Sequence, residues 1–305
     1  MAFHRIHSRE FPAGNIATAF PFHISMEGME SVLLCREEED YDALQKCFYV
    51  SCWSNNVIIV ADIEMSNHGH IIALAESQKA AQRAAFSIKQ RHAQYIATKY
   101  KEHNILSRSD IKVIYLDTDW YLRNALAYVP RNALDTGSTI ESYKWSSYRA
   151  MFSEELPDGP NYRVSMMTRR EKEAVFRTHA DLGRVPWMVD KYGILIPATA
   201  CEHLYAEEAF NNDQAFFLRI VGSVNCAEME LKLVTNPRKR QSDEDMRNTV
   251  RDVALRWFKT DVADLSPEMK TRIVPHLYRS HNTSVAQLAR CVGLTQAQVK
   301  EYIRK

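Results

Sequence analysis

Short apolar runs separated by polar breaks alternate along the first half of the chain and predict a mixture of strands and helices. Runs rich in β-branched and aromatic residues predict strands at 20–26, 31–35, 57–74 and 111–116. Apolar residues at helical spacing predict helices at 40–54, 78–102 and 119–131. This β-α-β-α-β-α order indicates a small antiparallel sheet backed by helices, of the ferredoxin-like kind.

The second half of the chain is predicted to be helical. A stretch dense in turn-forming and polar residues at 154–160 is the clearest linker. Beyond it, helices are predicted at 168–180, 198–210, 213–223, 226–234 and 242–259, with a basic loop at 236–241. The pattern therefore predicts an α+β domain at 1–153, a helical middle region at 160–260 and an all-α region at 265–305.

Residues 284–300 have the spacing of a helix-turn-helix. Ser284 is suited to cap a first helix, Gly293 permits a tight turn, and Val299 packs the second helix against the first. The second helix would present base-contacting side chains to duplex DNA, namely Thr295, Gln296, Gln298 and Lys300. The alternative is a helical hairpin that serves only for packing.

Composition and charge narrow the class of protein. The 305 residues are 46% hydrophobic and 25% charged, with a net charge of +1, which is typical of a soluble globular protein. Six cysteines lie apart without a Cys-x-x-Cys pair, and no signal peptide or membrane span is predicted, so we expect a cytoplasmic protein without a membrane partner.

Positive charge is concentrated in two places. Residues 83–112 hold seven Lys and Arg against two acidic residues, and residues 270–305 hold seven against one. Local basic patches on a nearly neutral protein favour contact with phosphates at chosen places. The alternative for each patch is a merely solvated helix face.

A pair of histidines lies within the strand-forming run at 57–74. Side chains two apart on an extended segment project from the same face, so His68 and His70 point the same way. Neutral imidazoles on a rigid strand make a half-site for a divalent metal. The alternative is two core or surface histidines that alternate by chance.

A tyrosine and an asparagine on the predicted helix at 119–131 complete a candidate site. Tyr128 and Asn132 are four residues apart and therefore share one helix face. A tyrosine hydroxyl can attack a phosphodiester that a bound cation polarises, and a carboxamide oxygen is a reasonable ligand for Mg²⁺ or Mn²⁺. The set is coherent for metal-assisted phosphodiester transfer.

Three segments resemble motifs of one family. Met65-Ser66-Asn67-His68-Gly69-His70 resembles the Met-Pro-Asn-His-x-His motif of the HUH single-tyrosine transposases. Tyr128-Val129-Pro130-Arg131-Asn132-Ala133-Leu134 is similar to the family's Tyr-Ile-x-x-Asn-Pro-Val segment, and Trp145-Ser146-Ser147-Tyr148 is similar to an ending found in its REP-associated branch. The motifs keep the family's order, and the resemblance covers roughly residues 10 to 150.

The resemblance implies a role for each matching residue. His68, His70 and Asn132 would bind a divalent metal, Mg²⁺ or Mn²⁺, and Tyr128 would open one DNA strand to give a 5′-phosphotyrosine link and a free 3′-hydroxyl. Single-stranded or hairpin DNA would be held by Lys89, Arg91 and Arg131. The C-terminal half is outside the resemblance, and binding of duplex DNA there is expected from the helix-turn-helix spacing alone. Whether the chain acts as a monomer or a homodimer stays open.

Departures from the family's motifs leave other functions open. Gly69 replaces a bulky apolar residue and is expected to loosen the strand, and Pro130 is expected to bend or interrupt its helix. Ser66 and Ala133 each replace a proline. The alternatives are a domesticated sequence-specific DNA-binding protein with little catalytic activity, and a phosphodiesterase that uses water as its nucleophile. Tyr95 and Tyr100 are rival nucleophiles of lower rank.

Overall fold

The chain forms two compact units. A computed structural model describes residues 3–27, 33–103, 106, 109–153, 156, 158–224, 243–280 and 283–304. The first unit comprises residues 1–27 and 34–229, and the second comprises residues 28–33 and 230–305. The predicted helix at 226–234, the basic loop at 236–241 and parts of the segments at 31–35 and 154–160 lie outside the described residues. No helix within these ranges has the length and apolar character needed to cross a membrane.

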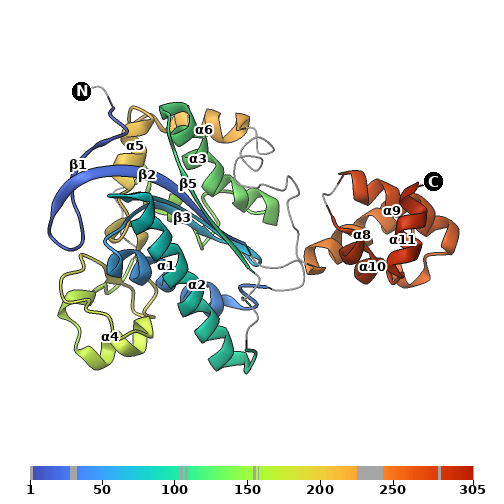
Figure 1. Cartoon of the computed structure of the whole chain (residues 1–305), viewed down its shortest axis with the longest axis horizontal. Helices are drawn as coiled ribbons and strands as arrows, with labels where there is room; N and C mark the ends of the chain where they lie inside the picture. The colour runs from blue at the N-terminus through green and yellow to red at the C-terminus, as the bar shows by residue number, and fades with distance from the viewer. Residues whose placement is uncertain are drawn as a thin grey trace. The chain divides into compact units, whose positions relative to one another are not determined.

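A curled antiparallel sheet forms the centre of the first unit (Figure 1). Its strands run in the order β3-β4-β2-β5, and a further strand, β1, pairs with the first part of β2. The strand bounds are β1 His7–Glu10, β2 Ile16–Glu27, β3 Ile58–Glu64, β4 His68–Ala75 and β5 Asp110–Tyr115. The prediction of an antiparallel sheet with helices is confirmed. Strand β1 was not predicted.

The run at 57–74 is a hairpin, which corrects the prediction of a single interrupted strand. β3 ends at Glu64, β4 begins at His68, and the backbone N–H of Met65 donates to the carbonyl of His68 at 2.8 Å. The polar break at Ser66 and Asn67 supplies residues that favour a tight turn. The two apolar halves of the run therefore pair with each other as neighbouring antiparallel strands.

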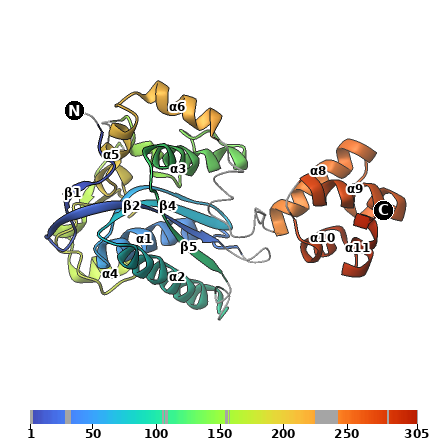
Figure 2. The same cartoon turned by 45° about the horizontal axis from the view of Figure 1, so that its top comes forward.

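Helices cover both faces of the sheet. α1 (Glu38–Ser54) and α2 (Gln78–Tyr100) pack on one face, and α3 (Asp119–Arg131) packs on the other (Figure 2). The three predicted helices are confirmed. Ile24 and Met26 of β2 lie against Phe48 of α1 and Ile88 of α2, so the intervening side chains of β2 face α3. Both faces of this sheet are therefore buried.

The Trp145-Ser146-Ser147-Tyr148 segment covers the edge of the sheet at β3. The N–H of Glu64 donates to the carbonyl of Trp145 at 3.0 Å, and the N–H of Asp62 donates to Oγ of Ser147 at 2.7 Å. Ser146 also forms a β-bridge with Ile63. Unpaired strand edges invite pairing with other chains, so the segment protects the edge nearest the histidine strand.

The rest of the first unit packs around this sheet. It contains α4 (Arg169–Phe176), a two-stranded ribbon of β6 (Tyr162–Arg163) and β7 (Met188–Val189), α5 (His203–Ala209) and α6 (Gln214–Ser223). The predicted helices at 168–180 and 198–210 were too long, because Arg177 adopts a left-handed conformation after α4 and α5 begins only at His203. The ring of Phe217 in α6 stacks on that of Tyr148 at 5.4 Å between centroids.

The second unit is helical in its described part. Its helices are α8 (Asp243–Phe258), α9 (Pro267–Ser280), α10 (Val285–Val292) and α11 (Gln296–Arg304). Ser284 caps α10 by accepting from the N–H of Gln287, and Gly293 ends that helix at φ 67°. Leu288 and Val299 are fully buried in the shared core. Of the predicted middle region, residues 160–224 belong to the first unit and α8 belongs to the second.

Candidate functional site

The two histidines project from β4 toward α3. Gly69 between them faces α1, and a Cβ atom at this position would lie 2.7 Å from Cζ of Phe48. The side chain of Phe48 thus occupies the space that a bulky residue would need. The expected loosening of the strand is not seen, because Gly69 pairs with Met26 on one side and with Glu64 on the other. The rings of His68 and His70 lie 5.0 Å apart between centroids.

Tyr128 and Asn132 approach these histidines from α3. The expected bend at Pro130 does not separate them, because α3 continues to Arg131 and a 3₁₀ turn follows at Asn132–Thr136. Nδ2 of Asn132 donates to the carbonyl of Tyr128 at 2.8 Å, and its Oδ1 lies 3.3 Å from Nε2 of His68. The Tyr128 ring lies 5.3 Å from that of His70. All four predicted residues are therefore close together.

The approach of His68 to Asn132 is compatible with a shared cation. Nδ1 of His68 lies 2.7 Å from Oδ1 of Asn67, which can only accept, so Nδ1 carries the proton and Nε2 of the neutral ring is an acceptor. Oδ1 of Asn132 is also an acceptor, because Nδ2 of its amide is engaged by backbone carbonyls. With this tautomer two acceptors face each other at 3.3 Å, an arrangement that a shared cation would stabilise.

The donor set fits a hard divalent metal. Adjacent ligands of an octahedral ion with bonds of about 2.1 Å lie about 3 Å apart, close to the observed separation of His68 Nε2 and Asn132 Oδ1. Within the described ranges, no group of three or more His, Cys, Asp or Glu side chains is arranged to hold a metal. The candidate ligands are thus two imidazoles and one carboxamide, a mixed set in which the carboxamide oxygen suits Mg²⁺ or Mn²⁺ and the imidazoles also suit softer divalent metals.

His23 of β2 is a further member of this site that the sequence did not single out. Its Nε2 lies 3.2 Å from Nδ1 of His70, and its side chain is fully buried. Burial lowers the pKa of His23 to about 3, so its ring is neutral. When Nδ1–H of His70 donates to His23, the ligand atom of His70 is Nε2. In the sequence, His23 is marked only as a polar residue in a predicted strand, where it alternates with the apolar residues Phe22, Ile24 and Met26.

Buried polar side chains continue across the same face of the sheet. Ser25 pairs in register with His70 on one side and with Lys112 on the other. Oγ of Ser25 and Nδ1 of His23 are buried, and neither has a hydrogen-bond partner in the part of the chain that the structure describes. Such atoms are rare in native cores and often mark the place of a ligand, ion or water.

The residues predicted to contact DNA fall into three places. On α2, across the sheet from Tyr128, Nζ of Lys89 donates to the carbonyl of Ser109 and Nη1 of Arg91 donates to Thr178. Arg131 lies next to Asn132 and forms a 3.6 Å ion pair with Asp135. Three predicted residues are exposed on α11, namely Gln296, Gln298 and Lys300. The structure therefore brings only Arg131 to the histidine site.

Three side chains predicted to contact DNA or to attack it have structural partners. Oε1 of Gln298 accepts from the backbone and hydroxyl of Thr295, which caps α11. The rival nucleophiles Tyr95 and Tyr100 both donate to the carboxylate of Asp40, at 2.7 Å each. These contacts hold α1 against α2, on the face of the sheet away from the histidines.

Comparison with known proteins gives one distant likeness. No protein-family model matches the sequence, and no curated protein matches it. Among solved structures, the chain is similar to a REP-associated tyrosine transposase bound to a REP hairpin, with a TM-score of 0.34 and 12% sequence identity. The match covers 52% of this chain and 95% of that chain. Because so low a TM-score does not establish a shared fold, the function proposed below is drawn from this chain's own side chains.

Proposed function

We propose that the chain is a DNA strand transferase of the HUH single-tyrosine type, with a ferredoxin-like catalytic unit. Tyr128 is the nucleophile, and His68, His70 and Asn132 hold a divalent metal. The observation that carries this proposal is the approach of two acceptor atoms, Nε2 of His68 and Oδ1 of Asn132, beside a tyrosine on the same helix as that asparagine.

The reaction conserves its atoms without a further reactant. The phenolic oxygen of Tyr128 forms a bond to phosphorus, the bond from phosphorus to the 3′ oxygen breaks, and the phenolic proton passes to that oxygen. The products are a 5′-phosphotyrosine link and a free 3′-hydroxyl. Attack by the 3′-hydroxyl of another strand reverses these steps, joins the strands and restores the tyrosine.

The side chains of the proposed site have separate roles in the reaction. The metal, when bound, supplies Lewis-acid polarisation of the scissile phosphate. Asn67 fixes the tautomer of His68, and His23 fixes that of His70, so that both rings offer Nε2 to a ligand. Tyr128 is only 3% exposed, so strand cleavage requires that the scissile phosphate gain access to its hydroxyl.

A denaturing-gel assay for a covalent protein–DNA adduct tests the proposal. The native chain is incubated with single-stranded hairpin oligonucleotides from the flanks of its gene, with Mn²⁺, Mg²⁺ or a chelator. We expect an adduct that requires the metal and is lost in Tyr128→Phe. Tyr95→Phe is the matched control, because Tyr95 donates to Asp40 away from the site and its loss should leave the adduct intact.

The other outcomes point to different functions. An adduct that survives Tyr128→Phe would assign the nucleophile to another tyrosine. Cleavage without an adduct would indicate a phosphodiesterase that uses water. Tight binding of the hairpin without cleavage would indicate a domesticated DNA-binding protein and would overturn the strand-transferase proposal.

A second candidate activity belongs to the second unit: sequence-specific binding of duplex DNA by a helix-turn-helix. The turn at Gly293 joins α10 to α11, and Gln296 and Lys300 are exposed on α11. Amide and amine side chains on such a helix can hydrogen-bond base edges in the major groove.

Selection of bound duplexes from a random-sequence pool tests this activity. The full chain should enrich a defined sequence, and Gln296→Ala should lose that preference. Arg247→Gln on α8 also removes an exposed polar side chain of the second unit, and it should keep the preference. Equal enrichment by all three proteins would show that α11 does not select the sequence.

A further inference from the structure

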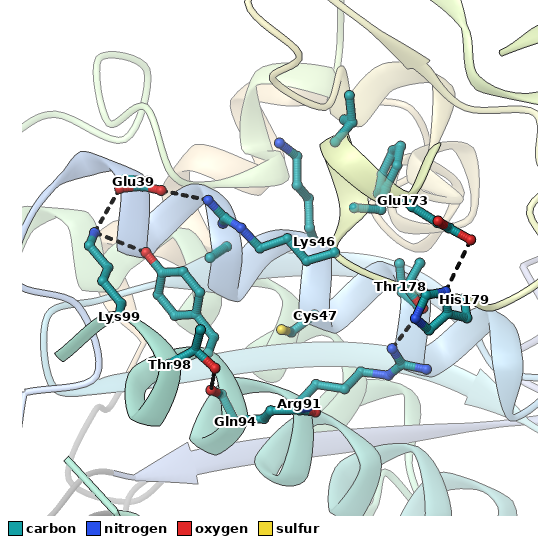
Figure 3. A pocket seen from close by; sticks show the side chains of 16 residues that line it. Glu39, Lys46, Cys47, Arg91, Gln94, Thr98, Lys99, Glu173, Thr178 and His179 are labelled. Atoms are coloured by element: carbon teal, nitrogen blue, oxygen red, sulfur yellow. Dashed lines mark hydrogen bonds and ion pairs between the residues drawn. The ribbon is translucent and has the colours of Figure 1, made fainter. Parts of the chain in front are cut away.

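A cavity of about 660 Å³ lies between α1, α2 and the segment that begins with α4 (Figure 3). It opens on the α1–α2 side of the sheet, whereas the histidine site faces α3. Its floor is apolar and contains Ala43, Cys47, Val50 and Phe176. The volume is that of an ordinary small-molecule site, for which about 300–1,000 Å³ is typical.

Most of the cations in the cavity wall are neutralised by carboxylates. Nζ of Lys46 lies 2.6 Å from Asp42, and Arg177 lies 2.5 Å from Glu39. Lys99 also pairs with Glu39, at 2.9 Å. Figure 3 shows Lys99 directed toward Glu39, which also pairs with Arg177. Their charges therefore do not require a ligand.

Arg91 is the exception among the cations of this wall. Its guanidinium runs along the cavity to Thr178, whose hydroxyl accepts from Nη1 at 2.8 Å (Figure 3). In the described part of the chain, no carboxylate lies within 4 Å of Arg91, and its buried Nε has no hydrogen-bond partner. A guanidinium offers five donors, and a partly buried charge without a counter-ion is unfavourable. An anion is the missing partner.

We propose that this cavity binds a small organic anion. A carboxylate or phosphate group of the ligand pairs with the guanidinium of Arg91, which suits such groups by its planar fork of donors. The rest of the ligand is apolar and covers the floor formed by Val50, Cys47 and Phe176. This site is separate from the proposed strand-transfer site and does not depend on it.

Cys47 supplies the readout for a test. Among the described cysteines it is half-buried and lines the cavity, whereas the other four are buried. Burial raises the pKa of its thiol to about 12, so little thiolate is present at neutral pH and alkylation is followed at a fixed alkaline pH. A ligand on the cavity floor should shield this thiol from iodoacetamide.

The experiment measures alkylation of Cys47 by peptide mapping of the full chain, with and without 10 mM of each probe. The probes are phenyl phosphate, benzoate, benzamide and inorganic phosphate. We expect phenyl phosphate or benzoate to slow alkylation at least fivefold. Benzamide lacks the charge and inorganic phosphate lacks the apolar body, so each should slow it less than twofold.

Variants separate binding from a merely structural role of Arg91. Arg91→Gln should abolish the protection, Arg91→Lys should keep part of it, and Arg83→Gln, on an exposed position of α2, should keep it fully. Rates are compared with and without probe within each variant, because Arg91 itself lowers the pKa of Cys47. A thermal melt of each variant confirms that it is folded.

Three results would overturn the proposal. The first is no protection of the native chain by either anion, and the second is equal protection in Arg91→Gln. The third is equal protection by benzamide, which would make the cavity a site for neutral ligands. If a hairpin oligonucleotide protects Cys47 and the small anions do not, the cavity belongs to DNA binding instead.

Discussion

His23 and His70 lie on neighbouring strands with Nε2 of the first 3.2 Å from Nδ1 of the second. His23 pairs in register with Ile72, two residues beyond His70, so the two rings meet diagonally across the β2–β4 ladder. Because burial keeps His23 neutral, its Nε2 can accept a hydrogen bond from Nδ1–H of His70. It is a positioning residue in the proposed metal site.

Replacing His23 should separate metal affinity from stability. His23→Leu removes the acceptor for Nδ1–H of His70, and we expect Mn²⁺ affinity to fall by about 10- to 100-fold, as for other outer-shell partners. The free energy of unfolding should change little, because the variant removes one buried nitrogen without a partner, Nδ1 of His23, but leaves Nδ1–H of His70 without its acceptor. Calorimetric titration with Mn²⁺ and urea unfolding measure the two quantities.

His23→Gln is the matched variant. Its side-chain amide reaches about as far as Nε2 of histidine and can still accept from His70. It should therefore keep most of the Mn²⁺ affinity that His23→Leu loses. Equal losses in both variants would show that His23 acts by filling space and not by orienting His70.

Local patterns were sufficient to predict the strand histidines but not the rest of their surroundings. His68, His70, Tyr128 and Asn132 are spaced by the periods of a strand and a helix, so each pair could be placed on one face. That the two pairs form one site was inferred from their shared chemistry and from the resemblance, not from any spacing in the sequence. His23 reaches His70 through the register of β2 and β4. These strands are joined by a long connection, so no local sequence pattern determines that register.

The sequence also did not indicate which way the basic side chains of α2 point. The basic run from Arg83 to Lys112 predicted DNA contact for Lys89 and Arg91 alike. In the structure Arg91 lines a cavity, because the segment after α4 packs over α2 and brings Thr178 to its guanidinium. Contacts between segments so far apart in sequence arise from tertiary packing. Counting the charges along a helix does not predict them.

Gly69 should be intolerant of even a methyl group. In Gly69→Ala the new Cβ meets Cζ of Phe48 at 2.7 Å, and we expect a loss of about 1–3 kcal/mol in the free energy of unfolding from overpacking. Urea unfolding measures the loss. Gly222→Ala is the control, because no atom lies within 4 Å of that site in α6 and alanine favours a helix. The control should be neutral or stabilising.

A double-mutant cycle tests whether contact with Phe48 causes the loss of stability in Gly69→Ala. Phe48→Leu withdraws the ring tip, so Gly69→Ala should cost less in that background, with a coupling energy of at least about 0.5 kcal/mol. If the two losses simply add, contact with Phe48 is not the reason for glycine at this position.

Asp40 should stabilise the protein at neutral pH and lose that effect in acid. Burial alone would raise the pKa of Asp40, but hydrogen bonds from Lys99, Tyr95 and Tyr100 outweigh it and lower the pKa to about 2. A lowered carboxyl pKa contributes stability above the ordinary value near 3.8, and that contribution is lost as the pH falls toward 2. The shift corresponds to about 2 kcal/mol at neutral pH.

Urea unfolding of Asp40→Asn at several pH values tests the pH range over which this stabilising effect is lost. The deficit of the variant should be largest at pH 6, fall by about half by pH 3 and nearly vanish at pH 2. Glu38→Gln on the same helix is the control, because Glu38 is largely exposed and its ion pair with Lys144 is at the surface. A deficit that does not change with pH would assign the role of Asp40 to packing.

Glu64 should have the opposite pH dependence. Its carboxyl is fully buried beside Asp62, and burial, followed by the charge of Asp62, raises its pKa well above the ordinary value near 4.5. The folded chain therefore keeps a proton that the unfolded chain releases, and stability falls as the pH rises above about 4.5. The fall is at most about 1.4 kcal/mol per pH unit, until the raised pKa is reached.

Glu64→Gln replaces this proton by a permanent amide donor of the same shape. The amide can donate to Asp62 and still accept from Gln45, which lies 3.4 Å away. We expect the variant to match the native chain near pH 5 and to be more stable at pH 8, as measured by urea unfolding at both values. Glu208→Gln, at an exposed position of α5, should show no such trend. A stability difference that is the same at pH 5 and pH 8 would mean that Glu64 is ionised in the folded chain, with its charge held by other groups of the α1 side of the sheet.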